Sequence, residues 1–271
     1  MNVYFLGGGN MAAAIIAGLV HQGGYDITVI GRNPQKQAHL ANTYGVATTD
    51  ILPELHAEDV LILAIKPQDM AAATAHINTN GALVLSVAAG LNIATLSEML
   101  HGHNRIIRIM PNTPCQVGMG MSGLYAPQHI SAHDRDFAET LMRTTGEVQW
   151  VPSEDAIDGI IGICGSGPAY VFYLLHALQQ AAEQQGFNPS DARRLSLATF
   201  KGAVALAEQS GTDFAQLQAN VTSKGGTTYA AIQTFEANHL AEGLVSGVAA
   251  CVARAQELAQ ELSGPKDGHA Q

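Results

Sequence analysis

The chain has 271 residues, of which 47% are hydrophobic and 13% are charged, and its formal net charge is −10. This composition is too apolar for a disordered chain, and the length predicts two domains or one large one. The negative charge argues against a nucleic-acid-binding protein, which needs clustered Lys and Arg. The small charged fraction also suggests that a partner subunit covers part of the surface.

The cysteines and the apolar segments bear on where the protein works. Cys115, Cys164 and Cys251 lie far apart and form no C-x-x-C pair, which disfavours a disulfide framework or a zinc site, and no histidines have metal-binding spacing. Residues 1–20 are apolar but lack a basic start and contain three consecutive glycines. No stretch reaches the ~18 apolar residues of a membrane span. We therefore expect a cytoplasmic protein without a metal ion or a membrane segment.

The first half of the chain alternates between strand and helix patterns. Continuous apolar runs predict buried strands at residues 2–6, 27–30, 60–65, 82–87 and 105–110. Helices are expected between them, and Asn33-Pro34 supplies a cap and a first-turn proline for the helix that ends near Tyr44. Strands buried on both faces and separated by helices predict a doubly wound α/β sheet of the Rossmann type.

The pattern changes after Trp150-Val151-Pro152. No later strand-like run is longer than residues 159–164, and helices are expected at 169–185, 189–209, after Thr212, after Thr227 and at 241–262. We therefore predict an α/β domain over residues 1–151 and an all-helical domain over residues 152–271. The many Ala and Gly residues of these helices favour close helix packing, including packing between subunits.

A glycine-rich turn follows the first expected strand. Residues 7–12 fit the pattern G-x-G-x-x-A, which binds the pyrophosphate of a dinucleotide at a helix N-terminus. Gly7 would allow the tight turn, Gly9 the close approach of the phosphate, and Ala12 the packing of helix on sheet. The predicted contacts are Gly7, Gly8, Gly9, Asn10 and Met11.

The end of the second strand bears on the choice of coenzyme. A carboxylate about 20 residues after the glycines would bind the ribose of NAD, but this chain has Gly31-Arg32-Asn33 there. Arg32, with Asn33 and Lys36, would instead hold a 2′-phosphate, which favours NADP(H) and leaves NAD(H) as the alternative coenzyme. The competing interpretation makes Arg32 an ordinary solvated loop residue.

Three further strand ends carry candidate coenzyme contacts, because ligands of α/β sheets bind at the carboxyl ends of strands. Small residues there leave room for the nicotinamide ribose, although plain turns would have the same composition. The predicted residues are Ala64, Ile65, Lys66, Pro67, Ala88, Ala89, Gly90 and Asn112.

Several segments together resemble the pyrroline-5-carboxylate reductase family. Besides the glycine turn, they are Ala64–Pro67, Ser86–Gly90, Arg108–Pro114, Gly165–Tyr170 and Val221–Thr228, and they extend over nearly the whole chain. One departure is Lys224, which stands where the family usually has proline. The resemblance implies a Rossmann domain, an all-helical dimerisation domain, and reduction of 1-pyrroline-5-carboxylate to L-proline, the last step of proline biosynthesis. It also implies dimers that can assemble further.

The resemblance places the substrate carboxylate on the loop before the helix expected near Thr227. The residues that it implies are Ser223, Gly226, Thr227 and Thr228, and free N–H groups and hydroxyls at a helix start suit a small anion. Thr228 is the candidate for a hydrogen bond near the ring nitrogen, so it is the predicted catalytic residue. A helix cap with turn glycines is the alternative.

Two other interpretations remain. A 6-phosphogluconate-type dehydrogenase shares the glycines at 162, 165 and 167, but it needs a catalytic lysine a few residues later, where this chain has only residues such as Tyr170 and Phe172. A non-catalytic nucleotide-binding protein would keep the first glycine turn without needing a second anion loop.

Overall fold

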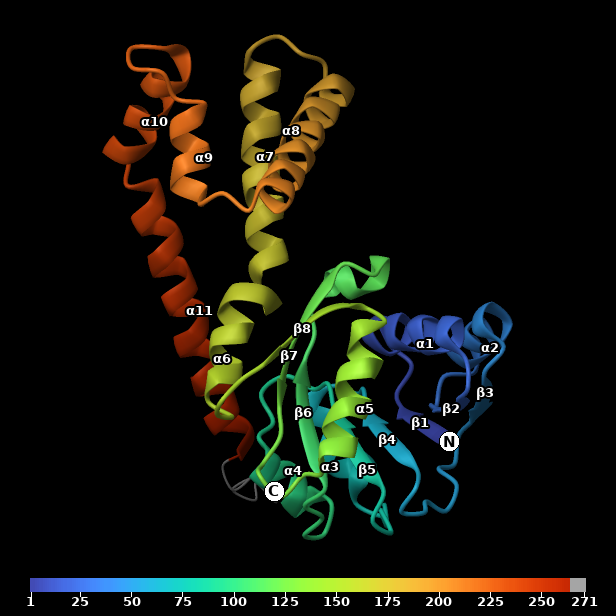
Figure 1. Ribbon diagram of the computed structural model, residues 1–271. Helices are drawn as coiled ribbons and strands as arrows, with labels where there is room; N and C mark the ends of the chain where they lie inside the picture. The colour runs from blue at the N-terminus through green and yellow to red at the C-terminus, as the bar shows by residue number, and fades with distance from the viewer. Residues whose placement is uncertain (264–271) are drawn as a thin grey trace, which may run out of the picture. The chain divides into compact units, whose positions relative to one another are not determined.

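The computed structural model describes residues 1–263, and residues 264–271 of the expected second domain lie outside this described part. The described chain divides into two compact units: Met1–Ser166 together with the chain from Cys251 onward, and Gly167–Ala250. The first unit is built on an eight-stranded sheet with the order β3-β2-β1-β4-β5-β6-β7-β8 (Figure 1). Its strands are β1 Asn2–Leu6, β2 Asp26–Ile30, β3 Ala47–Thr49, β4 Val60–Leu63, β5 Leu83–Ser86, β6 Ile106–Met110, β7 Gly120–Tyr125 and β8 Gly146–Trp150.

The first six strands are parallel, and β1, β4, β5 and β6 are buried on both faces, whereas the edge strand β3 is not. Val3 and Phe5 of β1 belong to one hydrophobic cluster, whereas Tyr4 and Leu6 belong to the cluster on the opposite face, as the two-residue period of a strand requires. The fold class predicted from the apolar runs is therefore confirmed.

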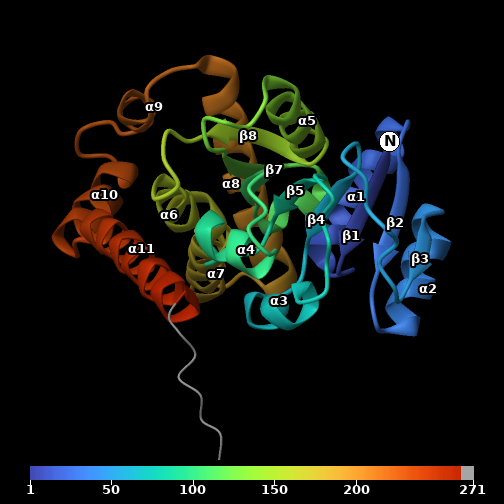
Figure 2. The same cartoon turned by 90° about the horizontal axis from the view of Figure 1, so that it is seen from below.

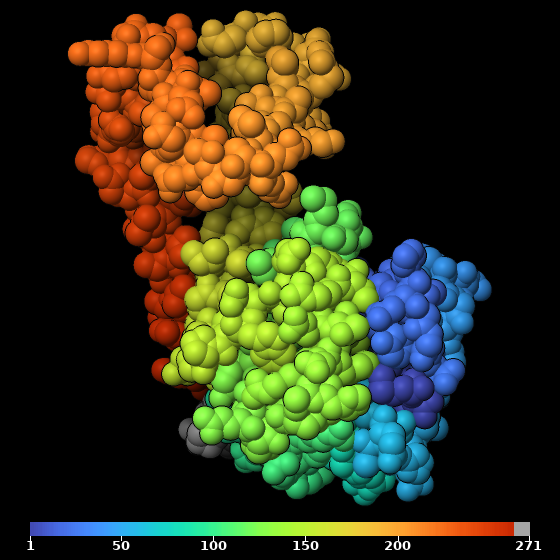
Figure 3. Space-filling model, in the orientation of Figure 1, coloured from blue at the N-terminus to red at the C-terminus, as the bar shows by residue number. Residues whose placement is uncertain are grey.

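Helices cover both faces of this sheet (Figure 2). The first cluster takes its helical residues from α1 (Asn10–Gln22), α2 (Pro34–Tyr44) and α5 (Ala132–Arg143), and the second takes them from α3 (Pro67–Thr74) and α4 (Ile93–Met99). In the space-filling view, α5 hides the strands behind it (Figure 3).

The end of the sheet differs from the sequence expectation. Strand β7 runs antiparallel to β6, and β8 runs parallel to β7, so the sheet is mixed. Both strands are poor in continuous apolar residues; β8 is only partly buried, with the pattern Gly-Glu-Val-Gln-Trp, which is why the sequence did not reveal it. The strand-like run at residues 159–164 is helical, because α6 (Ala156–Ile160) continues into a π-helix at Ile161–Gly165.

The second unit consists of helices with well-formed ends. They are α7 Gly167–Gln184, α8 Pro189–Ser210, α9 Phe214–Asn220, α10 Thr227–Ala237 and the first part of α11 Leu240–Ser263. The Asn188 side chain accepts a hydrogen bond from the Asp191 amide at the start of α8, and Gly211 ends that helix in the left-handed conformation.

Large apolar side chains of this helical unit are exposed in the single chain. Phe172 is 64% exposed, Tyr173 74%, Phe214 79% and Val245 70%. The continuous helical stretch Ala156–Gln184 is also long and apolar enough, by length and composition alone, to cross a membrane, contrary to the expectation that no stretch of the sequence is long enough. Such a helix is equally suited to burial against another protein chain.

The division into units differs from the boundary expected near residue 151. Ile160 of α6 packs directly against Gly123 of β7, so the chain stays with the sheet as far as Ser166. Leu262 near the end of α11 packs against the second hydrophobic cluster, which brings the last described residues into the first unit. The domain boundary at residue 151 therefore stays a prediction from the sequence. The two compact units of the structure meet instead at residues 166–167 and 250–251.

Candidate functional site

A cavity of about 810 Å³ lies at the carboxyl ends of β1, β2 and β4. Its walls include most of the residues predicted to bind a dinucleotide: Gly7, Gly8, Gly9, Arg32, Asn33, Lys36, Ala64, Ile65 and Lys66. Its volume lies in the range of small-molecule and cofactor sites. The carboxyl edge of a parallel sheet is also where such ligands bind in this architecture.

The glycine turn has the geometry that phosphate binding requires. Gly7 has a φ of 106°, and a Cβ at this position would collide with the Ala64 carbonyl oxygen and the Ile65 side chain. Nothing lies near the corresponding position of Gly9, which caps α1 without a side-chain hydrogen bond. The first N–H groups of α1 are therefore available to an anion at the mouth of the cavity.

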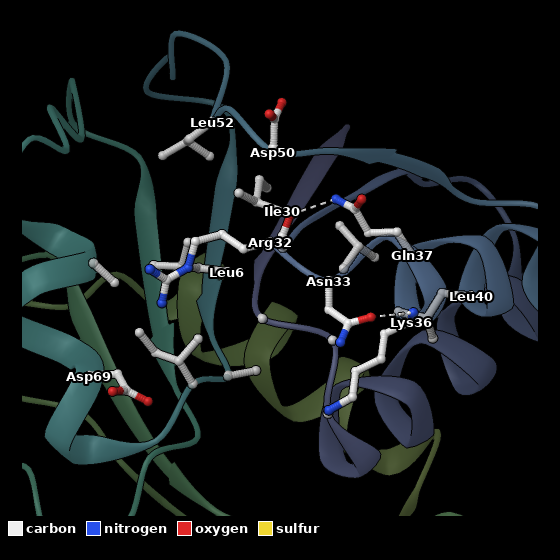
Figure 4. A pocket seen from close by; sticks show the side chains of 18 of the residues that line it. Leu6, Ile30, Arg32, Asn33, Lys36, Gln37, Leu40, Asp50, Leu52 and Asp69 are labelled. Carbon is white, nitrogen blue, oxygen red and sulfur yellow. Dashed lines mark hydrogen bonds between the residues drawn. The ribbon is translucent and has the colours of Figure 1, made fainter.

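Two positive groups of the cavity, Arg32 and Lys36, lie after β2 (Figure 4), and a third, Lys66, follows β4. Arg32 is exposed, its side chain points into the cavity, and it makes no ion pair with any residue between 1 and 263. Asn33 accepts a hydrogen bond from the Lys36 amide at 3.0 Å and so starts α2. The turn therefore presents two cations where NAD-binding proteins of this fold present a carboxylate.

The sequence did not identify several residues of this wall. Gln37 donates two hydrogen bonds across the turn, and Leu52, Ala73 and Ile77 give the cavity an apolar side. Leu52 follows a three-residue strand, β3, that is too short for a clear periodic signal. Ala73 lies in α3 and Ile77 follows it, and the sequence does not show that these apolar residues line a cavity.

The other predicted strand-end residues lie outside this cavity wall. Pro67 is the first residue of α3, and Ala88, Ala89 and Gly90 follow β5. Asn112 is buried, and its side chain donates to the Cys164 carbonyl at 3.0 Å and accepts from the Met121 amide at 3.0 Å. The Asn112 side chain thus connects the start of the 3-10 helix Thr113–Val117 to β7 and to the π-helix. The sequence motif around Asn112 does not predict this structural role.

One carboxylate connects three segments near the loop after β5. Glu154 Oε1 accepts a hydrogen bond from the Ile93 amide at 2.7 Å and pairs with Arg108 Nη1 at 3.2 Å. Arg108 is 4% exposed, and its Nη2 atom is buried without a partner among the described residues. Burial raises the pKa of the nearby Asp158 carboxyl, and Arg108 acts in the opposite direction.

The predicted carboxylate loop belongs to the helical unit. Gly225 has a φ of 74°, and Gly226 is the N-cap of α10 without a side-chain cap. The Gly226 amide donates to the Ser223 carbonyl at 3.0 Å, which closes a tight turn before Thr227 and Thr228. Ser223, Gly226, Thr227 and Thr228 therefore lie together at one helix start, and their contact with a substrate carboxylate stays a prediction. The first amides of a helix have no partner within the helix.

Comparison with known proteins covers both units. The family profile described as pyrroline-5-carboxylate reductase dimerisation matches residues 154–258, and the profile described as NADP oxidoreductase, coenzyme F420-dependent, matches residues 2–90.

Relatives and solved structures match the chain over nearly its whole length. A pyrroline-5-carboxylate reductase from Vibrio alginolyticus is 39% identical over 94% of this chain and 97% of its own, and one from Pseudomonas aeruginosa is 36% identical over 96% and 97%. The structure of a pyrroline-5-carboxylate reductase from Coxiella burnetii has a TM-score of 0.84 at 37% identity, covering 95% of this chain and 98% of that one. The Plasmodium falciparum enzyme, solved with NADP bound, shares the fold with a TM-score of 0.83 at 24% identity, over 96% and 98% of the two chains. The chain therefore belongs to the pyrroline-5-carboxylate reductase family.

Proposed function

We propose that the protein reduces 1-pyrroline-5-carboxylate to L-proline with a nicotinamide coenzyme, as the last step of proline biosynthesis in the cytoplasm. The observation that carries this proposal is the similarity to reductases of that name across both units, at up to 39% identity among those compared. The dinucleotide cavity of the first unit and the anion-binding loop of the second supply the two binding functions that the reaction needs.

The chemistry asks mainly for positioning. A cyclic imine is electrophilic, and protonation of its nitrogen increases this. The coenzyme, when bound, supplies a hydride to the imine carbon, and a proton is added to the nitrogen. The protein must therefore hold the two reactants together and exclude unproductive orientations, which gives large rate gains without a nucleophile or metal ion.

The coenzyme would bind along the glycine turn and the neighbouring strand ends. The α1 N-terminus would hold the pyrophosphate, and Ala64, Ile65 and Lys66 would line the path toward the nicotinamide. The proposed set of coenzyme contacts also includes Pro67, Ala88, Ala89, Gly90 and Asn112. Asn112 would contact the coenzyme through its backbone, because its side chain is already hydrogen-bonded to Cys164 and Met121. Arg32 and Lys36 favour NADPH over NADH, because they match a 2′-phosphate with two positive charges.

The substrate carboxylate would bind at the start of α10. The Ser223 hydroxyl and the amides of Thr227 and Thr228 offer several donors to one small anion, and Gly226, whose own amide is bonded to the Ser223 carbonyl, lets that anion approach the helix start closely. The Thr228 hydroxyl would donate or relay a hydrogen bond near the ring nitrogen. Lys224 adds a positive charge beside this loop.

Self-association through the helical unit accounts for its exposed apolar side chains. The family profile that covers this unit is a dimerisation profile, and a cavity of about 840 Å³ between its helices is walled by apolar residues such as Tyr173, Phe235 and Leu244. A second copy of the chain would cover these surfaces in a dimer, which can assemble further.

The direct test is turnover by the purified protein. We expect rapid, saturable oxidation of NADPH in the presence of 1-pyrroline-5-carboxylate, with formation of proline and slower turnover with NADH. The proposal is wrong if folded protein that binds NADPH oxidises neither coenzyme with this substrate.

A further inference from the structure

Gln37, on the first turns of α2, holds together the two strand ends that flank the proposed 2′-phosphate site. Its Nε2 atom donates to the Gly31 carbonyl at 2.7 Å and to the Thr49 carbonyl at 2.6 Å, as Figure 4 shows in part. The Gly31 amide also donates to Thr49 at 3.0 Å. A side-chain amide therefore fastens the turn after β2 to the end of β3.

The chemistry of these contacts fixes the orientation of the Gln37 amide. Both acceptors are carbonyl oxygens, so only the NH2 group, with its two hydrogens, can face them. The flipped amide would place Oε1 against two other oxygen atoms. Leucine or methionine at position 37 would fill a similar volume but would leave both carbonyls without this partner.

The fastened carbonyl controls the backbone of Arg32. The Gly31 carbonyl belongs to the planar peptide group whose nitrogen is that of Arg32, so holding the oxygen orients the whole peptide. On the other side of Arg32, Asn33 is held by its capping bond to the Lys36 amide. The exposed guanidinium thus projects from a backbone that is fixed on both sides.

We infer that Gln37 is a positioning residue that sets the preference for NADPH over NADH, an inference that rests on the proposed coenzyme site. A phosphate bound by a preorganised arginine costs less ordering entropy than one bound by a mobile turn. NADH has no 2′-phosphate, so the ordered backbone of Arg32 does not strengthen its binding. Loss of the Gln37 bonds weakens NADPH binding selectively, although Gln37 itself need not touch the coenzyme.

The experiment compares Gln37→Met and Gln37→Glu with Gln35→Met. Gln35 is exposed on the same helix and forms no side-chain hydrogen bond with a described residue, so it is a matched control. For each variant, the Kd of NADPH and of NADH, the KM for each coenzyme, and kcat are measured, with the melting temperature as the check of folding.

We expect Gln37→Met to raise the Kd and KM of NADPH by roughly five- to tenfold, the effect of one or two lost hydrogen bonds, and those of NADH by less than about twofold. Gln37→Glu should have a larger effect on NADPH, because its carboxylate faces two carbonyls and adds a negative charge near the phosphate. Gln35→Met should behave as the wild type.

Equal losses for both coenzymes, or an unchanged NADPH constant in a folded Gln37 variant, would overturn the inference. If Gln37→Met fails to fold, Gln37→Asn, which keeps an uncharged amide on a side chain one methylene shorter, gives the coenzyme ratio without an added charge. If the wild-type protein binds NADPH and NADH equally well, the proposed preference for NADPH is wrong. This result is distinct from a failure of the Gln37 inference, which is seen only in the variants.

Discussion

The Glu154 carboxylate and the Arg108 guanidinium form a 3.2 Å ion pair that is largely buried on the arginine side. The same carboxylate oxygen accepts the Ile93 amide at 2.7 Å, at the start of α4. Arg108 lies on β6 beside Ser86 of β5, so the pair ties the loop after β5 to the sheet and to the chain that leads into α6. This loop includes the proposed coenzyme residues Ala88–Gly90.

Glu154→Gln is expected to lower both stability and coenzyme binding. The change leaves the Arg108 charge buried without a carboxylate, which should cost about 2 kcal/mol or more of unfolding free energy. Denaturant unfolding measures this loss. Glu147→Gln is the control, because the Arg143–Glu147 pair is exposed and should contribute about 0.5 kcal/mol or less. Equal losses in the two variants would contradict a special role for the Glu154 pair.

Arg32→Ala should weaken NADPH binding by about tenfold or more, because a charge-assisted contact to the 2′-phosphate is removed. NADH binding should change little. Titration of each coenzyme against the purified protein gives the two constants. Arg194→Ala removes an arginine that is exposed in the helical unit and should leave both unchanged. If Arg32→Ala weakens both coenzymes equally, Arg32 is a solvated loop residue.

Thr228→Ala should lower kcat/KM for the imine by about 10- to 100-fold while leaving the NADPH Kd nearly unchanged. The reason is that Thr228 is proposed to contact substrate and not coenzyme. Thr234→Ala is the control on the same helix, since the Thr234 hydroxyl only donates to the Ala230 carbonyl at 3.0 Å. Unchanged steady-state kinetics for Thr228→Ala would remove it from the active site.

Acid should destabilise the first unit through Asp134. Arg105 donates to both carboxylate oxygens, at 2.9 and 2.7 Å, and these hydrogen bonds hold the pKa of Asp134 below its usual range. The unfolded chain therefore takes up this proton more readily than the folded one. The pair contributes its full stability above the unfolded pKa of about 3.9, and this contribution is lost as the pH falls through the lower, folded value.

Melting temperatures measured from neutral to acid pH test this linkage. Asp134→Asn should lower stability by about 2 kcal/mol at pH 7 and should weaken the dependence on pH below about 4. Asp136→Asn, at an exposed position of the same helix, serves as the control. A steep acid dependence that survives unchanged in Asp134→Asn would assign it to other carboxylates.

Phe172→Glu should shift the protein toward the monomer. Burial of one phenylalanine contributes about 1.5–3 kcal/mol, and a charge in an apolar interface adds a further cost, so association should weaken by at least about tenfold. Light scattering over a concentration series measures the mass. Gln180→Glu adds the same charge at an exposed polar position of α7. A Phe172→Glu variant with the wild-type mass would show that this face is not the interface.

Much of the first unit could be predicted because its signals are local. Continuous apolar runs identified β1, β2, β4, β5 and β6, and Asn33-Pro34 correctly located the start of α2. The glycine turn was recognisable because backbone conformation and phosphate access require glycine at fixed positions.

The remaining features depend on contacts between distant residues. Gln37 sits in an ordinary amphipathic helix, and only the folded chain brings it to the carbonyl of Thr49. Glu154 likewise reaches residues 61 and 46 positions away in sequence. Strand β8 is polar enough to resemble a loop, and the π-helix after α6 has no distinct composition. Apolar helices favour association between subunits, but the composition of one helical stretch, Ala156–Gln184, is equally that of a membrane span.

The path of α11 has a consequence for synthesis of the protein. Leu262 packs against the second hydrophobic cluster and also lies beside Gly90, where a Cβ would come within 2.9 Å of the end of the Leu262 side chain. This cap on the nucleotide-binding unit leaves the ribosome only after all of Gly167–Ala250 has been made. The sheet can begin to fold during translation, since N-terminal segments generally fold first. The part of the second cluster that Leu262 contacts stays uncovered until the helical unit has emerged, so the packing of the first unit is completed only after the second has been made.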